Sequence, residues 1–551
     1  MVGYVMYGDR FADTLRGVGG HLDYLGELGV RYVHLMPLLR AREGESDGGY
    51  AVAAYDEVEP RLGTMADLAG LADALHDREM NLCIDLVVNH TAEEHPWAQA
   101  ARAGDPRYRD FYFFFPDREM PDRYERTLRE VFPTFAPGSF TWLDDAQRWV
   151  WTTFNEFQWD LNWSNPAVFA AMVEVMLHLS NQGVDVLRLD AVPFMWKREG
   201  TDCENLPEVH TLLCTLRALM AIASPATIFK AEAIVAPEEL TAYVGAGSPE
   251  RHECELAYHN QLMVLLWSSL ATGEAKLMTT SLRRLPSIPS RASWVTYVRC
   301  HDDIGWAITD ENAAAVGWDG WAHRDFLVDF YRGEFPLSFA RGDVFQFNPE
   351  TGDGRTSGSA ASLCGIERAL EAEDPVHLDI ACRRLELVYA VAYSFGGVPL
   401  LYMGDELGVR NDASYLDDPA LADDNRWMHR PRMDWSVAAR RQVPGTLEAR
   451  LFEMMAGLAG DRASVAALHG AARLEVLQPT DSHLFAFARH HPDRGRFTMV
   501  ANFGNLTVVA DTAGLGCSPG AAVRRTGAGA TLEPGGVLTL PPLGYAWLVE
   551  P

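Results

Sequence analysis

Residues 81–90 read NLCIDLVVNH, an apolar run rich in β-branched residues that ends in two polar side chains, Asn89 and His90. Similar runs recur along the chain between amphipathic stretches such as HLDYLGELG and DLAGLADALHD. This alternation is typical of parallel strands joined by crossover helices. Eight candidate strands lie near residues 3–7, 32–36, 81–88, 185–190, 227–232, 254–258, 294–299 and 399–403. We therefore predict an α/β fold with a (β/α)8 barrel.

The uneven spacing of these strands indicates inserted material. Long irregular stretches follow the third and seventh strands, and such loops are usually functional or form small subdomains. After about Ala466, alternating runs such as HLFAFARHH and RFTMVANFG replace the helical period. We predict a barrel from residues 1–90, 166–303 and 371–465, an inserted domain at 91–165, an inserted subdomain at 304–370, and a C-terminal antiparallel β-sandwich at 466–551.

The composition is that of a globular protein, with 48% hydrophobic and 22% charged residues. No apolar run approaches the roughly 20 residues that cross a bilayer, and a formal charge of −29 opposes binding to nucleic acid. The first residues, MVGYVMYGDRFADTL, lack the pattern of a secretory signal, so cytoplasmic residence is expected. The eight cysteines form no CxxC pair, which predicts buried thiols and no zinc site.

The candidate chemistry lies at strand ends, because catalytic groups of a barrel come from the carboxyl ends of different strands. A single carboxylate there is more often a helix cap or an ion-pair partner. Three carboxylates after three separate strands, with histidine and arginine beside them, favour catalysis instead. Four runs end in such residues: Asn89 and His90; Arg188 and Asp190; Glu232; and His301, Asp302 and Asp303.

The stretches VVNH, DVLRLDAV, KAEA and CHDD resemble, in the same order, four signature regions of glycoside hydrolase family 13, the α-amylase superfamily. Other segments, including SDGGYAVAAYDEVEPRLGT, TTFNEFQWDLNWSNP, FQFNPETGDGRTSG and DDNRWMHRPR, resemble amylosucrase and sucrose hydrolase. The resemblance implies a retaining mechanism with Asp190 as nucleophile, Glu232 as general acid/base and Asp302 as transition-state carboxylate.

The residues themselves agree with this assignment. Arg188 lies two positions before Asp190 on the same strand face, and a neighbouring cation should keep a nucleophilic carboxylate ionised. Glu232 must instead stay protonated until it is used. Lys230 could oppose that from two positions away, unless its side chain points into the barrel wall.

The same resemblance implies a substrate site. An ion pair of Asp47 with Arg426 would close the glucosyl pocket, although by position alone Asp47 is a turn residue before two glycines. The FYFFF run at 111–115 is expected to form the core of the inserted domain rather than a sugar platform. The implied substrate residues are Asp47, Tyr50, His90, Phe154, Gln158, Arg188, His301 and Arg426 for the glucosyl unit, Asp303, Gln346 and Arg355 for the fructosyl unit, and Arg129, Arg324 and Phe326 along an acceptor path.

The leading hypothesis is a glucosyltransferase that cleaves sucrose, releases fructose and extends an α-1,4-glucan through a covalent β-glucosyl-enzyme. A sucrose hydrolase, which passes the glucosyl unit to water, shares these motifs. A non-catalytic glucan-binding protein is disfavoured because all three carboxylates are present. The expected partners are sucrose and a glycogen-like glucan, with the chain a monomer or homodimer. No cofactor or metal is expected, since the carboxylates perform the chemistry.

Overall fold

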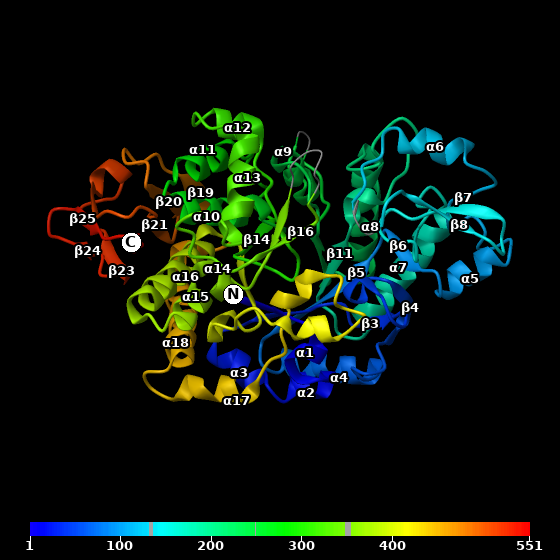
Figure 1. Ribbon diagram of the computed structural model, residues 1–551, viewed down its shortest axis with the longest axis horizontal. Helices are drawn as coiled ribbons and strands as arrows, with labels where there is room; N and C mark the ends of the chain where they lie inside the picture. The colour runs from blue at the N-terminus through cyan, green and yellow to red at the C-terminus, as the bar shows by residue number, and fades with distance from the viewer. Residues whose placement is uncertain (132–135, 248–249, 348–353, 551) are drawn as a thin grey trace.

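The computed structural model describes residues 1–131, 136–247, 250–347 and 354–550 (Figure 1). Its centre is a closed barrel of parallel strands in the order β1-β18-β14-β13-β12-β11-β5-β2. All eight predicted strands are present, with ends within two residues of those expected, so the predicted barrel is confirmed. The barrel strands are β1 (Gly3–Met6), β2 (Tyr32–Leu35), β5 (Asn81–Val87), β11 (Val186–Asp190), β12 (Ile228–Ala231), β13 (Leu256–Tyr258), β14 (Ser293–Tyr297) and β18 (Val398–Tyr402).

The barrel closes where β1 pairs with β2 on one side and with β18 on the other. Gly3 lies opposite Tyr32 and also opposite Leu400. Side chains of the strands are buried on both faces, as expected where helices cover the outside. The helices of the barrel region are α1 (Gly8–Ala12), α2 (Leu15–Gly19), α3 (Leu22–Glu27), α4 (Met65–His76), α7 (Pro166–Asn181), α8 (Pro207–Ala223), α9 (Pro237–Leu240), α10 (Asn260–Thr272), α11 (Lys276–Arg284), α16 (Pro375–Phe395), α17 (Trp435–Ala439) and α18 (Leu447–Ser464).

Capping residues set the starts of the long helices. Thr64 and Asp67 form a capping box at α4, each side chain accepting from the other's backbone N–H. Asn165 and Asp374 cap α7 and α16, and each is followed by proline at the first helical position. These capping residues set the residue at which each of these helices begins.

The first insert follows β5 and lies to the right of the barrel in Figure 1. Its aromatic run packs inward: Phe111 and Tyr112 are buried, and the ring of Phe115 lies 5.5 Å from that of Phe140. The run therefore forms the core of the insert, as predicted. The insert contains β6 (His90–Ala92), α5 (Pro96–Arg102), β7 (Phe114–Phe115), α6 (Glu119–Glu125), β8 (Phe140–Leu143), β9 (Arg148–Trp151) and β10 (Gln158–Asp160).

The second insert follows β14 and contains a small antiparallel sheet in the order β15-β17-β16. Residues 348–353 of the FQFNPETGDGRTSG segment lie outside the described residues. The elements are β15 (Ile304–Gly305), α12 (Asp310–Ala314), α13 (Gly320–Tyr331), β16 (Asp343–Phe345), β17 (Arg355–Ser357), α14 (Ala360–Cys364) and α15 (Ile366–Glu371).

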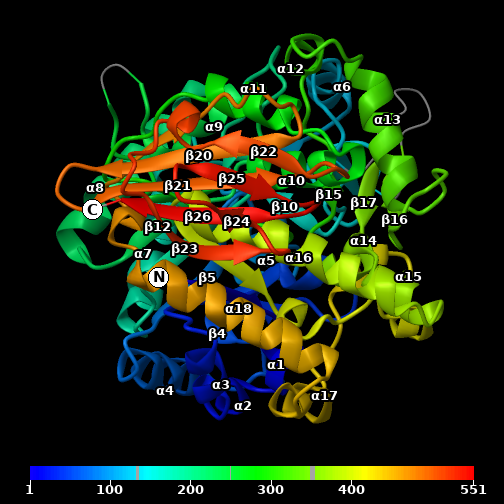
Figure 2. The ribbon, with the colours of Figure 1, turned by 90° about the vertical axis from the view of Figure 1, so that its left-hand side faces the viewer.

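The C-terminal part consists of antiparallel strands, as predicted (Figure 2). One sheet runs β19-β20-β21-β26-β23 and another β22-β25-β24. Phe395 at the end of α16 packs on Phe487 of β20, which attaches the sheet to the barrel. The strands are β19 (Arg473–Val476), β20 (Leu484–His491), β21 (Gly495–Asn502), β22 (Val508–Asp511), β23 (Ala522–Gly527), β24 (Thr531–Leu532), β25 (Val537–Leu540) and β26 (Tyr545–Glu550).

Within the described ranges, no helix has the length and apolar character needed to cross a bilayer.

Candidate active site

Two of the predicted carboxylates meet around one arginine at the carboxyl ends of β11 and β12. Arg188 Nη1 donates to Asp190 Oδ1 at 2.7 Å, and Arg188 Nη2 forms an ion pair with Glu232. The backbone N–H of Ala191 donates to Glu232 Oε2 at 2.9 Å. Barrel closure thus places Asp190 and Glu232 side by side, with Arg188 contacting both rather than Asp190 alone.

The surroundings of Asp190 raise its pKa, although the sequence predicts that Arg188 keeps this carboxylate ionised. Burial raises the pKa of Asp190, the Glu232 carboxylate raises it further, and the Arg188 guanidinium opposes both effects. A carboxyl group that lies beside a second carboxylate holds its proton more tightly, and a neighbouring guanidinium weakens that hold.

Lys230 points into the barrel interior, where it is fully buried. Its Nζ lies 3.1 Å from His34 Nδ1 and faces the rings of Tyr32 and Tyr258. An ammonium can only donate, so His34 Nδ1 accepts and His34 Nε2 donates to Asp85 Oδ1 at 2.8 Å. Lys230 therefore does not point into the barrel wall as expected, and it acts on the site through His34 and Asp85.

Asp85 is the central buried acid of the site. The charge of Arg188 and a hydrogen bond from His34 outweigh the effect of burial and lower its pKa. Tyr50 donates to Asp85 Oδ2 at 3.0 Å and, because its hydrogen is thus used, accepts from His301 Nε2 at 2.8 Å. Sequence reasoning missed Asp85, although an acid within an apolar strand is a usable signal for an inward-facing group.

Asp302, the third predicted carboxylate, lies at the end of the segment that follows β14. Its Oδ1 lies 3.7 Å from Arg426 Nη1 and 3.8 Å from Arg430 Nη2, and its Oδ2 lies 3.3 Å from His301 Nε2. Arg430 Nε also donates to the carbonyl of His301 at 2.7 Å. Arg430 was not predicted, because it is in the loop after β18, far from any strand end.

The ion pair expected between Asp47 and Arg426 is present, with Arg426 Nη2 3.2 Å from Asp47 Oδ1. Asp424, which was not predicted, also pairs with Arg426 at 2.8 Å. Gln158 joins this wall, because its Nε2 lies 3.4 Å from Asp47 Oδ2 and 3.0 Å from His90 Nε2. The ring of His90 packs 5.0 Å from that of Phe154, and burial lowers the pKa of His90 to about 4.

The backbone of the SDGGY stretch explains how Asp47 reaches this wall. Asp47, Gly48 and Gly49 have φ values of 51°, 66° and 98°, in the left-handed region that favours glycine. A Cβ on Gly48 would lie 3.0 Å from Tyr7 Oη and 3.2 Å from Arg430 Nη1. The turn therefore needs glycine both for its conformation and for its close approach to Arg430.

On the other side of Asp302, Arg355 Nη1 lies 3.8 Å from Asp303 Oδ2. Burial raises the pKa of Asp303, and the charge of Arg355 opposes that rise. Phe345, the residue before Gln346, lies beneath the Arg426 guanidinium at 4.8 Å. Of the predicted fructosyl residues, Arg355 lies on β17 of the short sheet, whereas Asp303 directly precedes β15 and Gln346 directly follows β16.

The three predicted acceptor-path residues are spread over the inserts. Arg324, on α13, donates to the carbonyl of Ile308 at 2.8 Å and to Asp310 at 2.9 Å. Phe326 packs against Phe335, with ring centres 4.8 Å apart. Arg129 is 78% exposed and lies 4.0 Å from Asp202. Their contacts are with the inserts and the loop after β11, so their role toward an acceptor stays a prediction.

The side-chain ammonium of Lys197 is surrounded by oxygen atoms beside Asn89. Its buried Nζ lies 2.6 Å from Asp160 Oδ2, 2.7 Å from the carbonyl of Phe194, and 3.4 Å from both Asn89 Oδ1 and Thr153 Oγ1. These oxygens come from the end of β5, the first insert and the loop after β11. Lys197, which sequence reasoning did not single out, supplies the positive charge at the place where these three segments meet.

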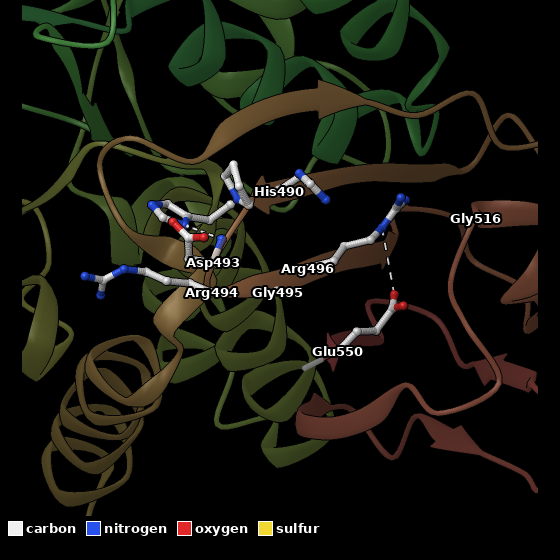
Figure 3. Close-up of a pocket in the computed structure, with 9 residues that line it drawn as sticks. His490, Asp493, Arg494, Gly495, Arg496, Gly516 and Glu550 are labelled. Carbon is white, nitrogen blue, oxygen red and sulfur yellow. Dashed lines mark hydrogen bonds and ion pairs between the residues drawn. The ribbon is translucent and has the colours of Figure 1, made fainter.

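A separate surface hollow of about 700 Å³ lies on the C-terminal sheet, at the turn between β20 and β21 (Figure 3). Arg496 and Glu550 form an ion pair at its edge, with N···O 3.8 Å. The hollow contains none of the predicted site residues. Its lining residues are His490, His491, Pro492, Asp493, Arg494, Gly495, Arg496, Gly516 and Glu550.

Comparison with known proteins identifies relatives of this chain. Curated relatives include the trehalose synthase/amylase of Mycobacterium tuberculosis, 32% identical over 406 residues, which are 73% of this chain and 60% of the relative. The glucosylglycerate phosphorylase of Escherichia coli is 28% identical over 385 residues, 69% of this chain and 63% of the relative. The chain thus spans less than two thirds of the length of these relatives.

Solved structures share the fold at low identity. A mutant of the isomaltulose synthase from Erwinia rhapontici, solved in complex with its natural substrate sucrose, superposes with a TM-score of 0.70 at 16% identity, covering 100% of this chain and 98% of that one. The sucrose 6F-phosphate phosphorylase of Thermoanaerobacter thermosaccharolyticum gives 0.69 at 19% identity, covering 91% and 93%. The family model for the α-amylase catalytic domain matches residues 6–304, more than half of the chain. With its closed barrel and its carboxylates at the strand ends, the chain belongs to the α-amylase family of glycoside hydrolases and transferases.

Proposed function

We propose that this protein is a retaining, sucrose-cleaving α-glucosyltransferase that releases fructose and extends an α-1,4-glucan. One observation carries the proposal: the segments that resemble amylosucrase, though far apart in sequence, meet around Asp302. SDGGY brings Asp47 to Arg426 of DDNRW, and GDGRTSG brings Arg355 to Asp303. Segments that shared only a structural role would have no reason to converge on one carboxylate.

The proposed reaction has two steps. Asp190 attacks the anomeric carbon while Glu232 donates its proton to the glycosidic oxygen, so that fructose leaves and a β-glucosyl ester forms on Asp190. Glu232, now ionised, then takes a proton from the incoming hydroxyl as the ester is displaced. Arg188 contacts both carboxyl groups and holds them in place through each step. Asp302 and His301 would bind sugar hydroxyls, more tightly as the ring flattens.

The Asp47–Arg426 pair supports action on a terminal glucosyl unit. Together with Asp424, Gln158 and His90 it forms a hydrogen-bonded wall on one side of the site. Such a wall leaves room for one sugar beyond the bond that is cleaved. The substrate would then be a small glucoside or a chain end rather than the middle of a polymer.

Two other acceptors have specific support. A relative named as a trehalose synthase, at 32% identity, favours transfer to a sugar hydroxyl that yields trehalose. A relative named as a glucosylglycerate phosphorylase favours transfer to phosphate. Water as acceptor would make the protein a sucrose hydrolase. All these reactions share the covalent step and differ only in what displaces the ester.

The deciding experiment incubates purified protein with sucrose, alone, with glycogen, and with inorganic phosphate. Fructose, glucose, trehalose, glucose 1-phosphate and glucan are measured together, and Asp190→Asn serves as the inactive control. We expect fructose in excess of glucose and longer glucan when glycogen is present. Equal glucose and fructose in every condition would identify a hydrolase, and no fructose at all would exclude sucrose as donor.

A further inference from the structure

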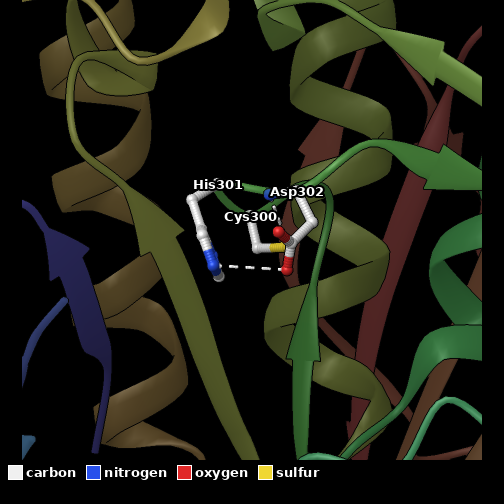
Figure 4. Close-up of side chains that lie close together, drawn as sticks. All are labelled: Cys300, His301 and Asp302. Carbon is white, nitrogen blue, oxygen red and sulfur yellow. Dashed lines mark hydrogen bonds and ion pairs between the residues drawn. The ribbon is translucent and has the colours of Figure 1, made fainter. Parts of the chain in front are cut away.

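Three consecutive residues after β14 bring metal-binding atoms together beside the proposed glucosyl site. The Sγ of Cys300, an imidazole nitrogen of His301 and a carboxylate oxygen of Asp302 all lie within 4.8 Å of one another (Figure 4). His301 Nε2 lies 3.3 Å from Asp302 Oδ2, and Cys300 Sγ lies 4.0 Å from the same oxygen. The backbone N–H of Asp302 points at Cys300 Sγ at 3.4 Å, which holds the thiol on the side of the carboxylate.

This set of donor atoms selects the kind of ion. One thiolate, one imidazole and one carboxylate are ligands for Zn²⁺ and Cd²⁺, whereas Ca²⁺ and Mg²⁺ require oxygen atoms. Tetrahedral Zn²⁺, with bonds of about 2.0–2.3 Å, places neighbouring ligand atoms roughly 3.3–3.6 Å apart. Two of the separations are 3.3 Å and 4.0 Å and the third is within 4.8 Å, so side-chain movements of about 1 Å would bring the three atoms to tetrahedral spacing. The fourth position stays open for water.

We propose that Cys300, His301 and Asp302 bind a thiophilic divalent cation such as Zn²⁺, and that the bound ion blocks the glucosyl site. The ion displaces the thiol proton of Cys300 to solvent. The neutral imidazole of His301 moves its proton from Nε2 to Nδ1 and coordinates through Nε2. No oxidant or reductant is involved. Spacing rules for paired cysteines do not detect this site, because it uses one cysteine with its two neighbours.

Occupancy has a predictable effect on substrate binding. The ion takes Asp302 Oδ2 and His301 Nε2, and it breaks the 2.8 Å hydrogen bond between His301 and Tyr50. The atoms proposed to hold sugar hydroxyls are then unavailable, so the cation and sucrose exclude each other. Only this inhibition rests on the proposed function, since cation binding itself does not require catalysis.

The first test measures binding without activity. The whole protein is dialysed against Zn²⁺, bound metal is counted, and Co²⁺ is added in parallel as a spectroscopic probe of a thiolate ligand. We expect one Zn²⁺ and a sulfur-to-cobalt charge-transfer band in the parent. Cys300→Ser should lose the band and bind Zn²⁺ at least about 10-fold more weakly. Cys214→Ser is the matched control, because Cys214 is the other partly exposed cysteine of the chain.

The second test measures inhibition relative to each variant's own rate without metal. Zn²⁺ should raise the apparent KM for sucrose in the parent and in Cys214→Ser, leave kcat unchanged, and be reversed by chelator. Equal Zn²⁺ affinity in the parent and in Cys300→Ser would show that Cys300 is not a ligand and would contradict the proposed site. Inhibition that sucrose does not relieve would show that the bound ion does not block the glucosyl site. If the protein does not cleave sucrose, the dialysis and Co²⁺ measurements still decide the binding claim.

Discussion

Asp190 and Glu232 share Arg188, yet they should respond differently to neutral replacements. Asp190→Asn removes the attacking carboxylate, so we expect turnover of sucrose to fall by about 10⁴-fold or more. Glu232→Gln removes the proton donor and should cost about 10²–10⁴-fold on sucrose, with much less loss on an α-glucoside whose leaving group needs no proton. Initial rates on sucrose and on α-glucosyl fluoride measure both effects.

The two variants control for each other, because each keeps the size of the side chain beside Arg188. Substantial sucrose cleavage by purified Asp190→Asn would show that another residue is the nucleophile. Equal losses on both substrates for Glu232→Gln would show that Glu232 is not the acid.

Lysine is scarce in this chain, and its placement is informative. The sequence contains only three lysines, and two of them, Lys197 and Lys230, are almost fully buried in the polar networks around the site. An ammonium is a compact point charge, whereas a guanidinium is a broad planar fork that does not fit the same position. We infer that these two positions require lysine.

Lys230→Met tests this inference by removing a buried positive charge while keeping much of the side-chain volume. Asp85 would lose the cation that faces it through His34, and a carboxyl group that loses a nearby cation has a higher pKa, so the acid limit of kcat/KM should move to higher pH. Profiles of kcat/KM against pH, with Lys276→Met as the control, measure the shift. If kcat/KM falls by the same factor at every pH, Lys230 contributes only to packing and not to the electrostatics of the site.

Sequence reasoning found the groups at strand ends, together with Arg188 inside β11, but it did not find the interior network of His34 and Asp85. The positions of Asp190, Glu232 and Asp302 follow from the ends of apolar runs. His34, Asp85 and Lys230 interact only because barrel closure brings β2, β5 and β12 together, and their partners are 51 and 196 residues apart. Nothing local in the sequence indicates that these three side chains share one interior.

The junction of the first insert with the barrel predicts independence from metal. Lys197 Nζ lies among the oxygens of Asn89, Thr153, Asp160 and Phe194. A metal cation at the same place would be repelled by the positive charge of the Lys197 ammonium. Dialysis against a strong chelator should leave the rate unchanged. Recovery of a lost rate by Ca²⁺ would contradict this reading.

Lys197→Met should destabilise the same junction. Asp160 would keep a buried charge without its partner, at a cost of about 3–5 kcal/mol. Thermal unfolding and limited proteolysis of the first insert measure the effect. Lys276→Met removes a lysine that faces the Trp318 ring and is the matched control. Equal stability of the two variants would show that Lys197 does not stabilise the junction between the first insert and the barrel.

The second insert bears on where the glucosyl unit goes. Arg324→Ala removes a cation from α13 without touching the three carboxylates, so fructose release should persist. We expect the share of free glucose to rise and the stimulation by glycogen to weaken, because a bound acceptor competes with water for the ester. Product ratios from sucrose, with and without glycogen, measure this.

The matched control is Arg341→Ala, which removes another arginine of the same insert, one that pairs with Glu371 on the surface. It should leave the product ratio unchanged. If Arg324→Ala leaves the ratio unchanged too, Arg324 serves only to hold Asp310 and Ile308.

The overall architecture was predictable because it depends on repeated local patterns. Apolar runs, the amphipathic stretches between them and the change of period near Ala466 predicted the strands, the barrel and the C-terminal β-domain. The walls of the site were harder to predict, because Asp424 and Arg430 lie in an irregular loop that is positioned by contacts with segments far away in sequence, such as those of Arg430 with His301 and Asp302. Periodicity carries no information about such loops.

A buried acid next to β18 makes the stability of the whole fold depend on pH. Glu406 accepts from the hydroxyls of Tyr4 and Tyr24, and burial raises its pKa to about 7. The folded state therefore holds the proton more tightly than the unfolded chain. Protonated Glu406 contributes about 3 kcal/mol to the free energy of unfolding, and this contribution is complete below about pH 4.5. It is lost as the pH rises from about 4.5 to 7. Above about pH 7 the free energy of unfolding no longer changes with pH through this group.

Glu406→Gln should remove this slope. Denaturant unfolding between pH 4.5 and 8 gives the free energy of unfolding for the parent, for Glu406→Gln and for Glu174→Gln, which replaces an exposed glutamate of α7. We expect only Glu406→Gln to flatten the curve. Parallel curves for all three proteins would assign the slope to other groups.

The burial of Lys197 and Lys230 also determines how the protein can be handled. Acylating reagents attack unprotonated amines, and arginine stays protonated at neutral pH. With two of the three lysines inaccessible, Lys276 and the terminal amine are the remaining targets. Amine-reactive dyes, crosslinkers and solid supports should therefore attach at no more than these two positions, and the two buried lysines beside the candidate site should stay unmodified.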